Sequence, residues 1–96
     1  MQKANDDDGW WDFLTLCAEI DSAAELHDFF GLFMTIEERR AMADRMLIIR
    51  DLVQGQKTQR EMADELHVSI AKITRGSNSL KIISDRLREF LINHFN

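Results

Sequence analysis

Apolar residues recur at helical spacing along most of the chain and predict several amphipathic helices. One face runs through Trp10, Phe13, Leu14, Cys17 and Ile20, and a second runs through Leu26, Phe29, Phe30 and Phe33. Between residues 10 and 34, sixteen of twenty-five positions are apolar, which is more than one stripe per helix. A helix that is apolar around most of its circumference must be buried on several sides. This segment therefore needs more cover than an isolated chain of this length provides.

Helix start signals divide the rest of the chain. Thr35–Glu38 and Thr58–Glu61 each have the capping-box pattern, in which a threonine is followed three residues later by a glutamate. The helix after the first box carries Met42, Met46, Ile49 and Val53 on one face and ends near Gly55. Ser69 and Ser84 are good N-caps for two further helices. We expect six helices with short connections, which is an all-α fold.

The length of 96 residues favours one domain that is marginally stable as a monomer. We expect residues 1–9 to form a flexible acidic arm and residues 10–96 to form a single helical domain. A second copy of the chain is the simplest cover for the excess apolar surface, because two-fold homodimers are the commonest oligomers.

Gln59–Leu66, a three-residue turn and a helix from Ile70 have the spacing of a helix-turn-helix, here placed at about residues 59–80. Ala63 is small where the two helices cross, and His67 stands where many such motifs have glycine. Apolar contacts that would fix the helix angle come from Met62, Leu66, Val68 and Ile73. The same spacing also occurs in helical hairpins that only pack in a bundle, so the pattern alone leaves both readings open.

Charge is distributed unevenly along the chain, and charge alone leaves open both a DNA-binding surface and an ordinary solvated face. The net charge is −5, but residues 1–31 contain Lys3 against eight acids, whereas residues 57–81 contain five basic residues against three acids. The start of the second helix in the motif is the part that meets base edges in the major groove. Ile70 and Ala71 suit a thymine methyl group, and Lys72 suits guanine or phosphate. Candidate DNA contacts are Gln59, Arg60, Ser69, Ile70, Ala71, Lys72, Thr74, Asn78 and Lys81.

Other chemistry has little support in the sequence. The three histidines and Cys17 lack the spacing of a zinc site, and no nucleophile–base pair or phosphate loop suggests an enzyme. No stretch is long enough to span a membrane, and the single cysteine fits a reducing cytoplasm. Met34, Met42 and Met46 are expected to fill the core, and Trp10 and Trp11 to anchor the dimer helix.

The run Ile73–Lys81, with Thr58–Glu61 upstream, resembles the tryptophan repressor family. The likeness extends more loosely from about Trp11 to Leu91 and includes Thr35, Arg39 and Arg45. This resemblance implies an intertwined, cytoplasmic homodimer that binds double-stranded operator DNA when L-tryptophan is bound as corepressor. Its targets would be genes of tryptophan biosynthesis or uptake, and no other cofactor is implied.

The resemblance also implies a ligand site. The indole ring would lie between Arg45 and Arg75, and Arg75 would also hold the carboxylate, with Thr35 of the partner chain nearby. Gly76 would leave room for the ring. The ammonium group would be received by Ser79 and by the backbone carbonyls of Leu32 and Met34. Guanidinium groups stack on aromatic rings and pair with carboxylates, which fits these assignments.

Two departures from the family pattern concern function. Ile36 follows Thr35 where family members carry proline, and Lys72 replaces a small polar residue in the recognition helix. The first removes some rigidity beside the ligand site, and the second bears on the operator sequence. The alternative hypothesis is a regulator of the same fold that does not respond to tryptophan. A more distant alternative is a helical module whose basic face binds an acidic protein.

Overall fold

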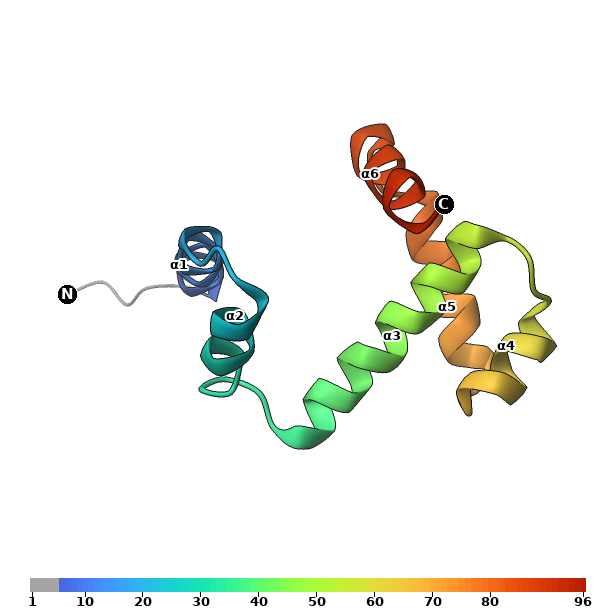
Figure 1. Cartoon of the computed structure of the whole chain (residues 1–96), viewed down its shortest axis with the longest axis horizontal. Helices are drawn as coiled ribbons and strands as arrows, with labels where there is room; N and C mark the ends of the chain where they lie inside the picture. The colour runs from blue at the N-terminus through green and yellow to red at the C-terminus, as the bar shows by residue number, and fades with distance from the viewer. Residues whose placement is uncertain (1–5) are drawn as a thin grey trace. The chain divides into compact units, whose positions relative to one another are not determined.

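A computed structural model describes residues 6–96, and all of their regular secondary structure is helical (Figure 1). The helices are α1 (Asp6–Glu19), α2 (Ala23–Phe30), α3 (Ile36–Gln54), α4 (Gln59–Leu66), α5 (Ile70–Lys81) and α6 (Asp85–Phe95). The prediction of six helices is confirmed for this part of the chain. No helix among residues 6–96 is both long and apolar enough to cross a membrane.

The chain divides into two compact units, the first ending at Thr35 and the second spanning Ile36–Asn96. In the first unit, aromatic side chains hold α1 and α2 together. The ring of Phe13 stacks on Phe29 and Phe30 at centroid distances of 5.6 and 5.8 Å, and it meets Phe33 edge-on at 5.2 Å. Such ring pairs add to the stabilisation from burial alone.

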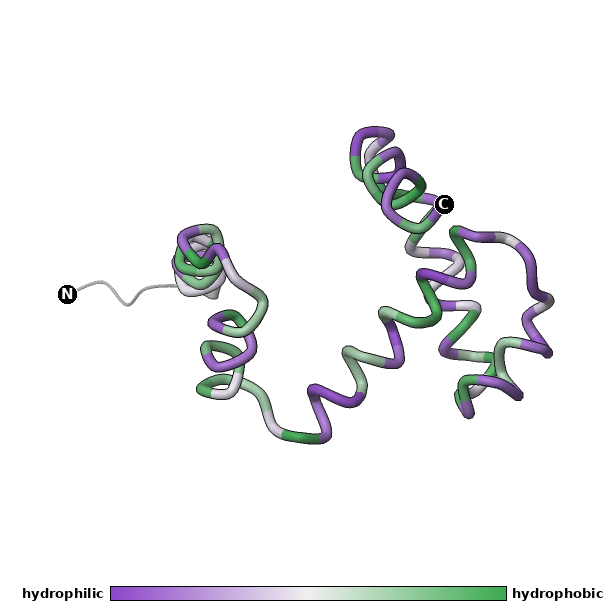
Figure 2. Tube along the Cα trace, in the orientation of Figure 1, coloured by the Kyte–Doolittle hydropathy of each residue, from purple (hydrophilic) through white to green (hydrophobic). Residues whose placement is uncertain are grey.

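The second unit is built on the long helix α3, which packs against α4, α5 and α6. Its buried apolar residues are Ile48, Met62, Val68 and Ile73. Leu52, Ala63 and Leu66 are partly buried against them. Figure 2 shows apolar and polar positions alternating along these helices, as expected for elements with one buried face. The contacts predicted to fix the helix-turn-helix angle are therefore those that form this core.

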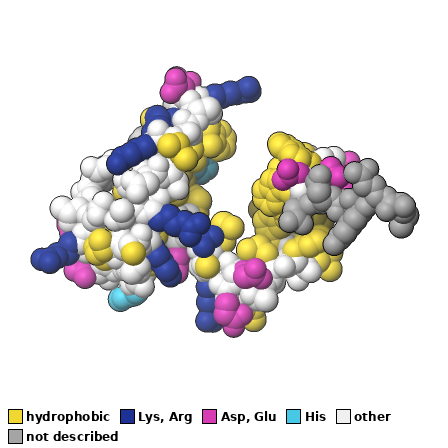
Figure 3. Space-filling view, turned by 180° about the vertical axis from the view of Figure 1, so that it is seen from behind, with side chains coloured by type: hydrophobic (Ala, Val, Ile, Leu, Met, Phe, Trp, Pro, Cys, Tyr) yellow, Lys and Arg dark blue, Asp and Glu magenta, His cyan; other side chains and the backbone are white. Residues whose placement is uncertain are grey.

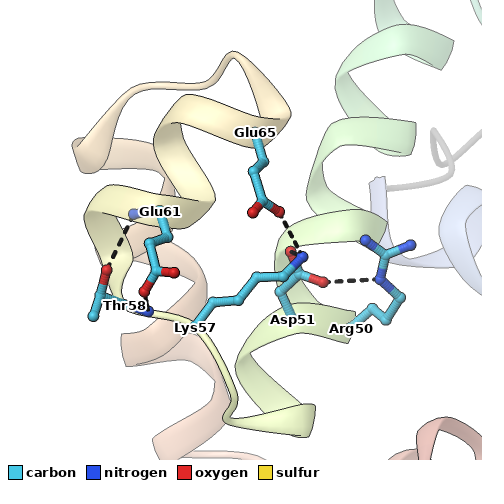
Figure 4. Close-up of polar contacts among 6 residues, drawn as sticks. All are labelled: Arg50, Asp51, Lys57, Thr58, Glu61 and Glu65. Atoms are coloured by element: carbon cyan, nitrogen blue, oxygen red, sulfur yellow. Dashed lines mark hydrogen bonds and ion pairs between the residues drawn. The ribbon is translucent and has the colours of Figure 1, made fainter.

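The predicted N-caps lie where the sequence placed them. Thr58 Oγ1 accepts from the backbone N–H of Glu61, and the Glu61 carboxylate accepts from the backbone N–H of Thr58, which completes a capping box (Figure 4). The Ser69 and Ser84 hydroxyls accept from the third residues of α5 and α6. α3 begins directly after Thr35. Ser22, which was not predicted, caps α2 in the same way.

Two details differ from the sequence-based expectation. α1 begins at Asp6 rather than Trp10, because aspartates such as Asp7 and Asp8 are favourable in the first turn of a helix. The remainder of the expected arm, residues 1–5, lies outside the described residues. Met42 and Met46 are exposed and do not fill the core of the second unit, because α3 buries its neighbouring face around Ile48.

Candidate functional site

The turn between α4 and α5 has the backbone geometry of a helix-turn-helix. His67 adopts a left-handed conformation with φ of 56°, as its place at the glycine position of the motif requires. The backbone N–H groups of His67 and Val68 both donate to the carbonyl of Ala63, which closes the end of α4. Val68 then enters the core, and Ser69 begins α5. α5 therefore begins directly after a tight, hydrogen-bonded turn at residues 67–69.

The residues predicted to contact DNA are all exposed on α4, the turn and α5. Ile70 exposes 47% of its surface at the start of α5. Lys81 Nζ lies 3.5 Å from Asn78 Oδ1 at the far end of α5. Figure 3 shows Lys and Arg side chains standing out from the second unit. These side chains are accessible to the phosphates of a nucleic acid. Contacts between basic side chains and phosphates supply most of the sequence-independent affinity of proteins for DNA.

A cavity of about 360 Å³ lies between α3 and α5, within the size range of small-ligand sites. Its lining comprises Ala41, Arg45, Ile48, Ile49, Lys72, Arg75, Gly76 and Ser79. The structure thus brings together Arg45, Arg75, Gly76 and Ser79, four of the seven residues predicted for ligand binding. Three lining residues are cationic and none is acidic, so this cavity favours a ligand with a negative group.

Gly76 allows α3 and α5 to approach closely. A Cβ atom at this position would lie 3.0 Å from Ile48 Cγ2 and 3.4 Å from Leu52 Cδ1. A larger residue would therefore push against α3 and change the spacing of the two helices that form the cavity. The family resemblance implied only that Gly76 leaves room for the indole ring. In the structure, Gly76 also allows α3 and α5 to pack closely.

Ser79 and Arg75 are joined along α5. The Ser79 hydroxyl donates to the backbone carbonyl of Arg75 at 3.0 Å. Because a hydroxyl has one donor and two acceptor sites, its oxygen can still accept a hydrogen bond from a ligand ammonium group. The bond uses only the backbone of Arg75, whose guanidinium remains exposed.

The other predicted ligand residues, Leu32, Met34 and Thr35, lie in the segment between α2 and α3. They belong to the first unit, whereas the cavity belongs to the second. Leu32 has 79% of its surface accessible. Their part in ligand binding stays a prediction.

Sequence reasoning assigned Lys72 to DNA alone, but the structure also places this residue in the cavity lining. Its spacing to Arg75 and Ser79, at three and seven residues, puts all three on one face of α5 and was the available signal. Ala41, Ile48 and Ile49 were also missed. They are ordinary apolar positions on α3, and only the packed helices reveal which of them border a cavity.

Sequence reasoning also missed a charged cluster that connects α3 to α4 (Figure 4). The buried Asp51 carboxylate accepts from Arg50 Nε at 2.9 Å and from Lys57 Nζ at 3.4 Å. Lys57 Nζ also lies 2.7 Å from Glu65 Oε2. The side chain of Asp51 is only 1% exposed, so these cations offset the cost of burying its charge. The cluster fixes the connection that places α4 beside α3.

Two pKa values in this region are shifted by the same contacts. The hydrogen bond to Glu65 raises the pKa of Lys57, and Asp51 acts in the same direction. The pKa of Glu61 is lowered, chiefly by the hydrogen bond from the Thr58 backbone N–H in the capping box. Both shifts indicate that folding favours the charged forms of these side chains.

Comparison with known proteins finds a family profile and several relatives that match this chain. The family profile described as "Trp repressor protein" matches residues 8–94. A protein named "Trp operon repressor homolog" from Chlamydia caviae is 50% identical over 93 residues, which cover 97% of this chain and 92% of the relative. Its namesake from Chlamydia trachomatis serovar D is 47% identical over 89 residues, covering 93% and 95% respectively. In Vibrio vulnificus, a protein of the same name is 48% identical over 60 residues, or 62% of this chain and 59% of the relative. The matched residues include all of α3, α4 and α5, which carry the cavity and the helix-turn-helix, and the chain belongs to the Trp repressor protein family.

Proposed function

We propose that this protein is a homodimeric transcriptional repressor that binds operator DNA when L-tryptophan occupies the cavity between α3 and α5. The observation that carries the proposal is the meeting of Arg45 from α3 with Arg75, Gly76 and Ser79 from α5 in one cavity. Membership of a repressor family supports the regulatory role.

The chemistry of the cavity fits a zwitterionic aromatic amino acid. Arg45 and Arg75 supply planar cations that can stack on an indole ring, and a guanidinium can also pair with the carboxylate. Ile48 and Ile49 supply an apolar wall for the ring. The Ser79 hydroxyl has acceptor capacity for the ammonium group. In the proposed dimer, Thr35 of the partner chain and the carbonyls of Leu32 and Met34 would complete the site.

The DNA-binding role rests on the exposed start of α5. Ser69, Ile70, Ala71, Lys72 and Thr74 would enter the major groove, as the first residues of recognition helices do. Outside this group, we assign Gln59, Arg60, Asn78 and Lys81 to the flanking DNA, where the basic ones would contact phosphates. Because one wall of the cavity is α5 itself, a ligand there can bias the position of the reading helix.

Calorimetric titration with L-tryptophan tests the ligand site. We expect the wild-type protein to bind one tryptophan per chain, and Arg45→Ala to weaken that affinity about tenfold or more through loss of the stacking cation. Arg40→Ala is the matched control, since Arg40 is exposed on the same helix and does not line the cavity. Absence of binding by the wild type would favour a regulator that does not respond to tryptophan. Equal affinities for the wild type and Arg45→Ala would show that the ligand site lies elsewhere.

A further inference from the structure

Lys72 belongs to two surfaces at once. It is an exposed residue in the first turn of α5, on the part of the helix assigned to DNA. Its side chain also lines the cavity between α3 and α5. Of the nine residues assigned to DNA, Lys72 alone has this double position. A ligand in the cavity can therefore affect a DNA-contacting side chain directly, in addition to moving the whole helix.

The position of Lys72 within the cavity indicates which part of a ligand it meets. Lys72, Arg75 and Ser79 lie on one face of α5, and seven residues of helix separate Lys72 from Ser79 by about 10 Å along the axis. Helical side chains lean toward the helix N-terminus, so the Lys72 stem extends away from Ser79. If Arg75 and Ser79 hold the amino-acid head group, Lys72 is the α5 lining residue farthest from that group and is left to flank the aromatic ring.

Among residues 6–96, no ion pair joins Lys72, Arg45 or Arg75 to an acid. Their like charges around one cavity oppose inward orientations, but a lysine stem with four rotatable bonds keeps many conformations. A ring that fills the cavity removes the inward ones. The stem can then cover the apolar ring while the ammonium stays in solvent.

We propose that Lys72 couples ligand occupancy to DNA binding, because a bound aromatic ring orders its side chain for contact with a DNA phosphate. The inference rests on the proposed function, in which the ligand is L-tryptophan. It makes Lys72 different from Lys81, which lies at the opposite end of α5, outside the cavity lining, and approaches Asn78 instead. Both lysines contribute charge to DNA binding, but only Lys72 contributes to the effect of the ligand.

The test measures DNA affinity with and without saturating L-tryptophan at one salt concentration. The probe is a fluorescent duplex that the wild-type protein selects from a random-sequence pool in the presence of L-tryptophan. The quantity compared is the dissociation constant without L-tryptophan divided by the dissociation constant with L-tryptophan. We expect Lys72→Ala to reduce this ratio roughly 3- to 10-fold for each α5 helix that contacts the DNA. This is the size expected when one lysine side chain is no longer ordered before binding. Lys72→Arg should keep most of the ratio, since it retains a long cationic side chain.

Lys81→Ala is the matched control. It should weaken binding by a similar factor with and without L-tryptophan, and so leave the ratio unchanged. The Lys72 proposal is overturned if Lys72→Ala behaves like Lys81→Ala, even though the wild type still responds to tryptophan. A wild-type ratio of one would overturn the corepressor function as well, so the two failures are distinguishable.

Discussion

His67 has the only positive φ of a non-glycine residue among residues 6–96. A left-handed conformation brings Cβ close to the neighbouring carbonyl and costs a non-glycine residue roughly 1–2 kcal/mol. Histidine is one of the residue types that adopts it more readily than most. The tight turn before α5 therefore stores a small local strain.

The strain at His67 gives a prediction about stability. We expect His67→Gly to keep or raise the free energy of unfolding, because relief of strain offsets the greater flexibility of glycine in the unfolded chain. His67→Val should lower it by about 1–2 kcal/mol, since a β-branched residue is a poor occupant of this conformation. Urea denaturation at neutral pH measures both changes. Equal stabilities for the two variants would mean that the turn does not keep φ positive.

Asp51 supports the connection between α3 and α4 through its side-chain carboxylate. Its carboxylate is buried and joined to Arg50 and Lys57. We expect Asp51→Ala to lower the free energy of unfolding by about 1–3 kcal/mol, because it removes charged hydrogen bonds and leaves a gap at the connection to α4. Asp64→Ala, at an exposed position on α4, is the control and should change it little. A small effect of both substitutions would show that the cluster does not support the fold.

At the scale of helices, the cap of α4 links stability to pH. The pKa of Glu61 is lowered by its hydrogen bond with Thr58, so the folded state favours the charged carboxylate. This contribution is present above the ordinary glutamate pKa and is lost as the pH falls through the lowered value. We expect part of the loss of stability between about pH 5 and pH 3 to disappear in Glu61→Gln, which retains an acceptor for the capping box. Identical urea midpoints across this range for the wild type and the variant would contradict the role of the cap.

The crossing of α3 and α5 depends on Gly76. We expect Gly76→Val to lower the free energy of unfolding by about 1–3 kcal/mol, because its side chain must enter space occupied by Ile48 and Leu52. Ala71→Val is the control, since Ala71 is exposed on the same helix and the change also introduces a β-branched apolar residue. Thermal and urea unfolding of the two variants measures the difference. A destabilisation as large in Ala71→Val would assign the effect to β-branching in α5 instead of helix crossing.

The helices and caps were largely predictable because their signals are local. Thr58, Ser69 and Ser84 each precede a helix at the predicted residue, and His67 adopts the conformation that its motif position required. The cavity was predictable only through a family resemblance, because Arg45 and Arg75 are thirty residues apart and meet by packing. The burial of Asp51 and the position of Lys72 in the cavity were missed. A charged residue on a helix is expected to be exposed unless its neighbours in space are known.

At the scale of the whole molecule, exposed apolar side chains indicate a missing partner surface. Large apolar residues with more than half of their surface accessible include Trp10, Trp11, Leu32, Phe33, Ile36, Met42, Ile82 and Phe90. Figure 3 shows hydrophobic side chains gathered over the α1–α2 unit. Soluble monomers seldom expose extended apolar surface of this kind.

We therefore expect the protein to form a dimer at micromolar concentration, with a melting temperature that rises with protein concentration. Burial of the exposed tryptophans and phenylalanines against a second copy supplies the stabilisation. Sedimentation equilibrium combined with circular dichroism over a range of dilutions measures assembly and folding together. A folded monomer that persists at all concentrations, with a constant melting temperature, would contradict the dimer.

We expect occupancy of the cavity to control DNA binding. In a dimer, two recognition helices must be spaced by about one turn of DNA, roughly 34–36 Å, to engage both half-sites. A ligand held between α3 and α5 can favour that arrangement only by its difference in affinity for the competing ones. The most direct test is a titration of the selected duplex with wild-type protein, with and without saturating L-tryptophan, at one fixed salt concentration. We expect L-tryptophan to tighten binding about tenfold or more, whereas superimposable curves would show that occupancy of the cavity does not control DNA binding.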